Sequence, residues 1–295
     1  MSKQNRNYSS DKVMLSKESA FSGHTFKKSL GQNFIKDTNL LRAIVSDSDI
    51  SEEDCVLEIG AGAGTLTEAI CEKAGRVVAV EVDESLRETL SQKEAENNNL
   101  KVIFSDIMKT DLSVLHNLLG LTGADGEAVG KYKKYKVVAN LPYYITTPIL
   151  FKLLEDHKNI KTISIMVQKE VAERIVSDET SGDYGVLTLM VKFFGEAKIA
   201  RLVGRQNFYP QPKVDSAIVR IDIREDINEE LLKKFSRLVK CAFSARRKTL
   251  ANNLKREYGF SGEQIETILG AVGKTQLVRG EDLSFQEFVT LAQNI

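Results

Sequence analysis

The sequence predicts an α/β fold that is followed by a small, all-helical domain. Short apolar segments rich in β-branched residues recur along the chain, with polar side chains at or near their ends. Buried strands of an open α/β sheet have this composition. The segments span 54–59, 76–83, 101–107 and 137–139. Three alternating glycines follow the first of them. From about residue 225 onward the periodicity is helical. We therefore expect a flexible tail over 1–21, an α/β domain over 22–224 and a helical domain over 225–295.

The composition fits a globular protein with a substantial core. The chain has 295 residues, 42% of them hydrophobic, and a formal net charge of +0, so its overall charge does not point to nucleic acid. This average hides an asymmetry, because Lys and Arg outnumber Asp and Glu roughly two to one over 190–258. The three cysteines are widely spaced without a C-x-x-C pair, which argues against both a disulfide framework and a metal site.

Signals for a membrane or for export are not found in the sequence. It contains no run of about 18 apolar residues, so it predicts no membrane span. Residues 1–20 are polar and mixed in charge, and they lack the apolar stretch of a secretory signal. Together with the isolated cysteines, these features predict a cytoplasmic protein.

The first α/β unit opens with a loop and a glycine-rich turn. Segment 26–37 is expected to be a loop, and Asp37 or Thr38 is placed to cap a helix that runs through Val45. The strand over 54–59 then runs into a glycine-rich turn and a helix, as in a Rossmann-like fold; the glycines are Gly60, Gly62 and Gly64. Such a turn lets the backbone approach a ligand closely. The spacing departs from G-x-G-x-x-G, so it is weak evidence for a dinucleotide.

Acidic residues follow the next two strands. Glu81 lies about 20 residues after the glycines, where a carboxylate can accept both ribose hydroxyls of a nucleoside. Asp106 ends the third strand, where it can accept a hydrogen bond from an adenine amino group, and Ile107 offers its backbone amide. NAD and S-adenosylmethionine are both compatible with this pattern.

The segment over 137–144 is the most distinctive in the chain. Asn140 ends an apolar strand, at the edge where open α/β sheets bind ligands. Pro142 stops the strand, and Tyr143 and Tyr144 place aromatic rings beside an amide that both donates and accepts hydrogen bonds. The combination predicts a pocket for a planar amine.

The remaining α/β elements lead to a second proline-containing segment. A helix through His157, a strand over 162–167, a helix from Gln168 and an apolar helix and strand are expected in turn. Segment 207–216 is held extended by two prolines, and we expect it to face the prolines near Asn140. A closing strand over 217–223 ends this part of the chain.

The motifs together resemble those of the ribosomal RNA adenine N6,N6-dimethyltransferases, most closely the bacterial small-subunit branch. The resemblance runs from about residue 22 to the C-terminus, and its order of motifs is highly specific. It rests on Gly31-Gln32-Asn33-Phe34, Glu58-Ile59-Gly60-Ala61-Gly62, Glu81, Asp106, Asn140-Leu141-Pro142-Tyr143, the segment from Phe208 to Ser216 and Arg246-Arg247-Lys248. It implies a class I S-adenosylmethionine-dependent methyltransferase that dimethylates two adjacent adenosines near the 3′ end of small-subunit ribosomal RNA.

The resemblance also implies a role for individual residues. Asn33 and Ile35 would line the methionine end of the cofactor, with Gly60 and Gly62 beneath it. Glu81 would hold the ribose, and Asp106 with Ile107 the adenine. The catalytic set would be Asn140, Leu141, Pro142, Tyr143 and Phe208, and Asn140 would also contact the cofactor, at its sulfonium. Lys213, Arg246, Arg247 and Lys248 would contact RNA, and the partner would be small-subunit RNA or an immature subunit, bound by a monomer.

The expected chemistry needs orientation and no strong base. The oxygen of Asn140 and the carbonyl of Leu141 would accept hydrogen bonds from the target amine and direct its lone pair at the sulfonium methyl. The base must leave its stack, and Tyr143 and Phe208 are the expected stacking faces, whereas Tyr144 is expected to pack. Basic helices would make the affinity for RNA fall with salt.

Three alternatives remain at this level. A related enzyme class methylates large-subunit RNA and shares most of these motifs. A non-catalytic RNA-binding assembly factor would keep the fold without needing Asn140 and the acids. An NAD-dependent dehydrogenase fits the glycines and Glu81 but leaves Asp106 and the segment after Asn140 unexplained.

Overall fold

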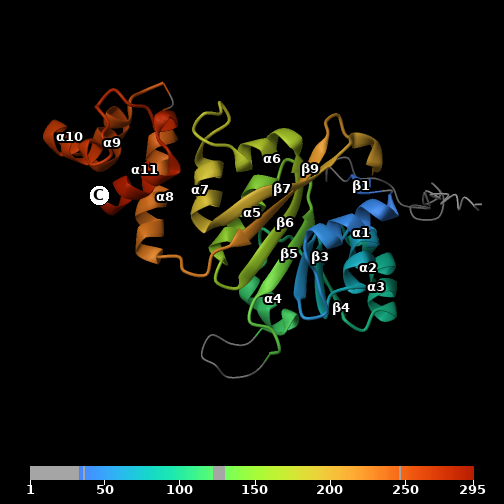
Figure 1. The fold of residues 1–295 in the computed structure, drawn as a ribbon. Coiled ribbons are helices and arrows are strands. Elements are labelled where there is room, and N and C mark those ends of the chain that lie inside the picture. The colour runs from blue at the N-terminus through green and yellow to red at the C-terminus, as the bar shows by residue number, and fades with distance from the viewer. Residues whose placement is uncertain (1–32, 36, 122–129, 246) are drawn as a thin grey trace, which may run out of the picture.

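A seven-stranded mixed sheet forms the centre of the protein, in a computed structural model that describes residues 33–35, 37–121, 130–245 and 247–295 (Figure 1). Its strands are β2 (Cys55–Ile59), β3 (Arg76–Glu81), β4 (Leu100–Phe104), β5 (Tyr135–Asn140), β6 (Ile160–Gln168), β7 (Gly195–Val203) and β9 (Ser216–Ile223). They lie in the order β4-β3-β2-β5-β6-β9-β7. The pairs from β4 to β6 are parallel, and β9 is antiparallel to both of its neighbours. This arrangement confirms the predicted Rossmann-like α/β fold.

Helices cover both faces of the sheet. They are α1 (Thr38–Asp47), α2 (Thr65–Cys71), α3 (Arg87–Glu96), α4 (Leu112–Leu119), α5 (Thr146–Glu155), α6 (Lys169–Val176) and α7 (Val186–Phe194), with short 3-10 turns at Glu84–Leu86 and Arg205–Asn207. Apolar residues of α1, α2 and α3 share one buried cluster with alternate residues of the strands. Those of α4, α5, α6 and α7 belong to the cluster on the other face. Strands buried on both faces explain the uninterrupted apolar runs in the sequence.

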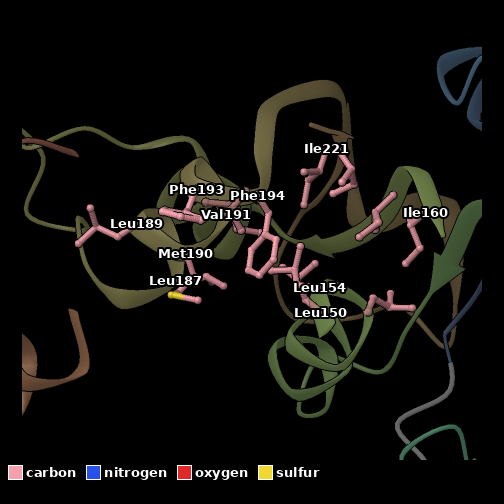
Figure 2. Close-up of a cluster of buried hydrophobic side chains, with 14 of the residues drawn as sticks. Leu150, Leu154, Ile160, Leu187, Leu189, Met190, Val191, Phe193, Phe194 and Ile221 are labelled. Atoms are coloured by element: carbon pink, nitrogen blue, oxygen red, sulfur yellow. The ribbon is translucent and has the colours of Figure 1, made fainter. Parts of the chain in front are cut away.

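After the last strand, helices are the only regular secondary structure in the described residues. These helices are α8 (Glu229–Phe243), α9 (Leu250–Tyr258), α10 (Gly262–Gly270) and α11 (Phe285–Gln293), with a 3-10 turn at Gly280–Asp282. They gather at one end of the molecule beside α7 (Figure 1). Figure 2 shows the core next to them, where side chains of α5, β6, α7 and β9 converge. Because the same apolar cluster continues into α8–α11, a division into two domains near residue 225 stays a prediction.

A second, two-stranded sheet joins segments that are far apart in the sequence. Its strands β1 (Phe34–Ile35) and β8 (Phe208–Tyr209) pair antiparallel, so that Ile35 lies opposite Phe208. The sequence predicts a loop over 26–37 and an extended chain over 207–216. It does not predict that these two segments pair as strands. Each strand has only two residues, which is too short for a periodic signal.

Two further features complete the description of the fold. Asp37 caps α1, because its side chain accepts a hydrogen bond from the backbone of Asn39, as its position in the sequence predicts. Among the described residues, no helix is long and apolar enough to cross a membrane.

Candidate active site

A cavity of about 1010 Å³, its open mouth included, lies at the carboxyl ends of β2, β3 and β5. It brings together most of the residues that the motifs single out: Asn33, Ile35, Gly60, Gly62, Glu81, Asp106, Ile107, Asn140, Leu141, Pro142 and Tyr143. Phe208, Lys213, Arg247 and Lys248 do not line it, and Arg246 lies outside the described residues. Parallel strands place their carboxyl ends at one edge, so four separate motifs converge there.

The floor of the cavity is the glycine-rich turn after β2. Gly60 and Gly62 have φ values of +81° and +57°, a region that side chains with a Cβ rarely adopt. A Cβ on Gly62 would lie 2.8 Å from the ring of Phe34, which lines the cavity beside it. A side chain at Gly62 would collide with this ring, and the positive φ values favour glycine at both positions.

Glu81 supports this turn and lies at the edge of the cavity. One of its carboxyl oxygens accepts a hydrogen bond from the backbone of Gly62 at 2.8 Å. The other accepts from Val82 and Asp83, at 2.9 and 2.8 Å. Burial raises the pKa of the Glu81 carboxyl, while these three bonds act in the opposite direction. Two carboxylate oxygens offer about four acceptor positions, so capacity for a ligand hydroxyl remains.

An apolar slot with one carboxylate continues beyond Glu81. Ile107 is buried, Val82 is exposed, and both line the cavity. Asp106 lines it as well, and its side chain accepts a hydrogen bond from the backbone of Met108 at 2.9 Å. A flat, apolar ring with an amino group at its edge matches this slot. The sequence pattern missed Val82, because its exposure depends on the turn that follows β3.

Asn140 is fixed by a contact with a segment from the beginning of the chain. Its Nδ2 donates a hydrogen bond to the carbonyl oxygen of Asn33, at 3.1 Å. This bond orients the amide, so that its oxygen is the end turned away from that carbonyl. Leu141 and Pro142 follow it along the cavity wall. The arrangement leaves an acceptor, Oδ1, available to a ligand amine.

The two tyrosines after Pro142 have opposite environments. Tyr143 is half-buried, and its hydroxyl lies 2.8 Å from the hydroxyl of Ser216. Tyr144 is 65% exposed and also lines the cavity, so the expectation that it packs in the interior is wrong. Both rings therefore reach the rim.

Phe208 does not present a face to a ligand in this structure. Its side chain is 1% exposed and belongs to the apolar cluster formed with α1 and α2, which corrects the prediction of a stacking face. The reason is the pairing with β1, which sets Phe208 opposite the buried Ile35. Successive residues of a strand point to opposite sides, and the next residue, Tyr209, is 43% exposed.

The cavity fits S-adenosylmethionine by its shape and by its polar groups. Bare backbone at Gly60 and Gly62 admits a close approach, Glu81 offers acceptors for ribose hydroxyls, and the slot at Asp106 suits an adenine ring. These residues lie in the order in which the parts of a nucleoside follow one another. The methionine end of the cofactor would then lie near Asn33 and Asn140. The side-chain amide of Asn140 is held there by the carbonyl oxygen of Asn33.

The expected RNA-binding residues lie on the surface, away from the cavity wall. Lys213 is exposed in the segment before β9, and Arg247 and Lys248 are exposed in the turn between α8 and α9. Lys233 and Lys240 are exposed on α8. Arg237 is less available, because it forms an ion pair with Glu257 at 3.2 Å.

In the part of the chain that the structure describes, no histidine lines the cavity and no cluster of side chains could hold a metal ion. His116 lies 2.8 Å from Asp156, and His157 lies 3.3 Å from Glu229; neither lines the cavity. No group of three or more His, Cys, Asp or Glu side chains in the described ranges could hold a metal ion.

Glu58 is a buried acid directly before the glycine-rich turn. It is 0% exposed, and neither of its carboxyl oxygens has a hydrogen-bond partner within the described structure. Burial raises its pKa to about 7, and the negative charge of Glu81 adds to the effect. The folded protein binds this proton more tightly than the unfolded chain does. Protonated Glu58 therefore contributes to the stability of the fold at low pH, and this contribution is lost as the pH rises through 7.

The variant Glu58→Gln, which keeps the neutral shape, is expected to be more stable than the parent above pH 7, by up to about 3 kcal/mol. The difference should vanish below pH 4.5, where Glu58 is protonated in both the folded and the unfolded chain. Melting temperatures of both proteins across this pH range measure it. The exposed Glu53→Gln is the control and should follow the parent. Parallel curves for Glu58→Gln and the parent would show that Glu58 is ionised in the fold.

Comparisons with known proteins agree with this geometry. The model of the family described as ribosomal RNA adenine dimethylase matches residues 23–293. A ribosomal RNA small subunit methyltransferase A from Clostridium acetobutylicum is 40% identical over 274 residues, which cover 92% of this chain and 94% of the relative. The protein of the same name from Shouchella clausii is 42% identical, with 92% and 90% covered.

Solved structures give the same result for the fold. A dimethyladenosine transferase from Plasmodium falciparum matches with a TM-score of 0.72 and 26% identity, covering 88% of this chain and 95% of that one. The 23S rRNA methyltransferase ErmE matches with a TM-score of 0.66 and 24% identity, covering 88% and 98%. At that identity the second match supports the fold alone.

Proposed function

Because this chain belongs to the ribosomal RNA adenine dimethylase family, we propose that it dimethylates N6 of two adjacent adenosines near the 3′ end of small-subunit ribosomal RNA. It is an S-adenosylmethionine-dependent methyltransferase. The match covers 92% of the chain, so the proposal concerns the protein as a whole.

One observation carries the proposal at the level of residues. A single cavity is lined both by the nucleoside-binding set, with Gly60, Glu81 and Asp106, and by the amide segment from Asn140 to Tyr143. The first set suits a cofactor and the second suits a planar amine. Their junction at Asn140 is where a methyl group would pass from one to the other.

We assign to Asn140 and Leu141 the orientation of the amine. The exocyclic nitrogen of adenine is a poor nucleophile, because its lone pair is delocalised into the ring. The Asn140 oxygen and the Leu141 carbonyl would accept hydrogen bonds from its two hydrogens and favour a pyramidal nitrogen. The bond from Asn140 to Asn33 fixes the first acceptor before the substrate arrives, so little reorganisation is needed.

Bound S-adenosylmethionine supplies an electrophilic methyl group on a sulfonium. The protein contributes position, because a reacting pair held in line gains rate from orientation alone. The same acceptors stabilise the positive charge that develops on the amine during transfer. The methylated amine carries a positive charge and is acidic, so it loses one proton to water after the transfer. No side chain of the described cavity therefore needs to act as a strong base.

We assign the stacking of the target base to Tyr143. A base that reacts at N6 must leave its helix, and an aromatic face compensates the lost stacking by about 1–3 kcal/mol. Tyr143 lines the cavity beside Asn140 and Pro142, whereas Phe208 is buried. The ring of Tyr144 lies exposed at the same rim, within reach of the RNA that carries the base.

We propose that RNA phosphates contact the basic residues of α8 and of the turn between α8 and α9. Replacing Arg247 and Lys248 by Ala should weaken RNA binding and reduce the slope of log affinity against log salt by about 1 to 2, because each phosphate contact releases condensed counterions. Binding of a small-subunit RNA hairpin, measured between low and physiological salt, gives the slope.

The matched control replaces two exposed lysines, Lys73→Ala and Lys133→Ala. They lie just before β3 and β5, at the amino ends of these strands, whereas the cavity lies at the carboxyl ends. Their slope should equal that of the parent. If the Arg247 and Lys248 variant also keeps the parent slope, the RNA binds on another surface.

We further propose that the active species is a monomer acting in the cytoplasm on an immature small subunit. The glycine turn, Glu81, Asp106 and the segment from Asn140 to Tyr143 meet within one chain, which is compatible with a monomer.

Mass spectrometry of nucleosides decides the function and its substrate. Immature small subunits, free small-subunit RNA and large-subunit RNA are each incubated with the protein and S-adenosylmethionine. Dimethyladenosine at two adjacent positions of the small-subunit RNA is the expected product. Modification of large-subunit RNA alone would assign the chain to the related enzymes that methylate large-subunit RNA, and modification of none would contradict the proposal.

A further inference from the structure

Two motifs that are distant in the sequence meet at a single hydrogen bond. The hydroxyl of Tyr143, after β5, lies 2.8 Å from the hydroxyl of Ser216, the first residue of β9. Burial raises the pKa of the Tyr143 phenol, so the contact joins two neutral hydroxyls. A half-buried ring that lines the cavity is thus tied at its far end to the central sheet.

Ser216 is suited to hold that ring in place. It is 0% exposed, and its backbone lies between Gln168 of β6 and Val203 of β7 in the register of the sheet. Strands on both sides fix its position, so its hydroxyl is a rigid reference point. Tyr143, in contrast, lies in an irregular segment between β5 and α5, where the backbone alone restrains the ring less.

The contact closes a ring of interactions around the cavity. Asn140 bonds to Asn33, and the adjoining β1 pairs with β8. From β8 the chain runs on to Ser216, which bonds back to Tyr143, three residues after Asn140. Asn140, assigned to the target amine, is therefore held through β1, and Tyr143, assigned to the target base, is held through the segment that follows β8. The pairing of β1 with β8 joins the two.

We propose that Ser216 is a positioning residue for methyl transfer, which holds the ring of Tyr143 at the angle that stacks the target base beside Asn140. The inference rests on the proposed function, because it assigns the base to that ring. Ser216 itself does not touch the base. Loss of its hydroxyl frees the ring to tilt, so that the base enters the cavity without a fixed orientation.

The test compares Ser216→Ala, Tyr143→Phe and the double variant. Each single variant should lower kcat/KM for the RNA by about three- to tenfold, the effect of one net hydrogen bond. The double variant should lose no more than the worse single one, because both substitutions remove the same bond. Ser216→Thr, which keeps a hydroxyl, should recover part of the activity.

A matched control is available on the neighbouring strand. Ser164 of β6 is 2% exposed, and its hydroxyl has no hydrogen-bond partner within the described structure. Ser164→Ala removes a buried hydroxyl of the same kind, and it should leave kcat/KM unchanged. The comparison separates the loss of this particular bond from the general effect of a small change in the sheet.

A fluorescent base reports its stacking on the ring; 2-aminopurine has no 6-amino group, so its signal does not include the hydrogen bonds assigned to Asn140 and Leu141. RNA that carries 2-aminopurine at the target position is quenched when the base stacks on an aromatic ring, so Ser216→Ala and Tyr143→Phe should both give a brighter complex than the parent. Their affinity for S-adenosylmethionine and their melting temperatures should stay close to the parent's. A merely structural role of Ser216 would change these two quantities and leave the fluorescence of the bound RNA unaltered.

The outcomes separate this inference from the proposed function. A parent protein that forms no dimethyladenosine overturns the function itself. An active parent with an equally active Ser216→Ala overturns the positioning role, as do additive losses in the double variant. A fall in cofactor affinity equal to the fall in kcat/KM would also overturn it, because Ser216 would then act through β8 and β1.

Discussion

Replacing Asn140 by Ala is expected to lower the rate of methyl transfer by about 100- to 1000-fold, the usual effect of removing one group that stabilises the transition state. The amide oxygen is the acceptor assigned to the amine, and Ala leaves nothing in its place. Binding of S-adenosylmethionine should be nearly unchanged, because Glu81, Asp106 and the glycine turn remain. Single-turnover methylation and calorimetric titration of the cofactor measure the two quantities separately.

The control for this variant is Asn97→Ala. Asn97 donates one side-chain hydrogen bond to a backbone carbonyl, that of Lys93 at 2.8 Å, much as Asn140 does to Asn33, but it lies outside the cavity. It should retain the rate of the parent. Normal turnover by Asn140→Ala would remove Asn140 from the mechanism, whereas a parallel loss of cofactor binding would make it a cofactor ligand only.

Replacing Glu81 by Gln should weaken S-adenosylmethionine binding by about 100-fold, the value of a charged hydrogen bond in a buried site. Glu81 uses both carboxyl oxygens as acceptors for backbone N–H groups. A Gln side chain has one oxygen, so its NH2 must face one of these donors, either that of Gly62 or that of Val82. The repulsion disturbs the glycine turn and removes an acceptor for the ribose.

Equilibrium titration of Glu81→Gln with the cofactor, below its melting temperature, measures this effect. Glu84→Gln is the control, because the Glu84 side chain lies three residues further on, is 63% exposed and pairs only with Arg87 in the described contacts. Its affinity should equal that of the parent. An unaltered affinity for Glu81→Gln would mean that the ribose is held elsewhere in the cavity.

Much of the site follows from local sequence, because its parts are local. The glycines stand directly after a buried strand, and Glu81 and Asp106 stand at or just beyond the ends of the next two. Parallel strands must bring these ends to one edge, so the order of strand and polar residue predicts their convergence without knowledge of the packing. The roles of the individual residues stay predictions until they are measured.

The aromatic residues show where this reasoning stops. Phe208 and Tyr209 are adjacent and similar, and which of them is buried depends on the register with β1. A shift of one residue in that pairing would exchange them. Each strand of the pair is too short to carry a periodic pattern. The local sequence therefore does not indicate which of the two aromatic side chains is buried.

Local sequence predicts the α/β fold, the edge of the sheet at which the cavity opens and the position of Asn140, because strand burial and turn chemistry act over a few neighbouring residues. The burial of Phe208, the exposure of Tyr144 and the contact between Ser216 and Tyr143 are visible only in the folded structure. These features arise from contacts between segments that lie far apart along the chain. Such contacts form when the sheet and its covering helices have packed, and their energy depends on that packing rather than on either segment alone.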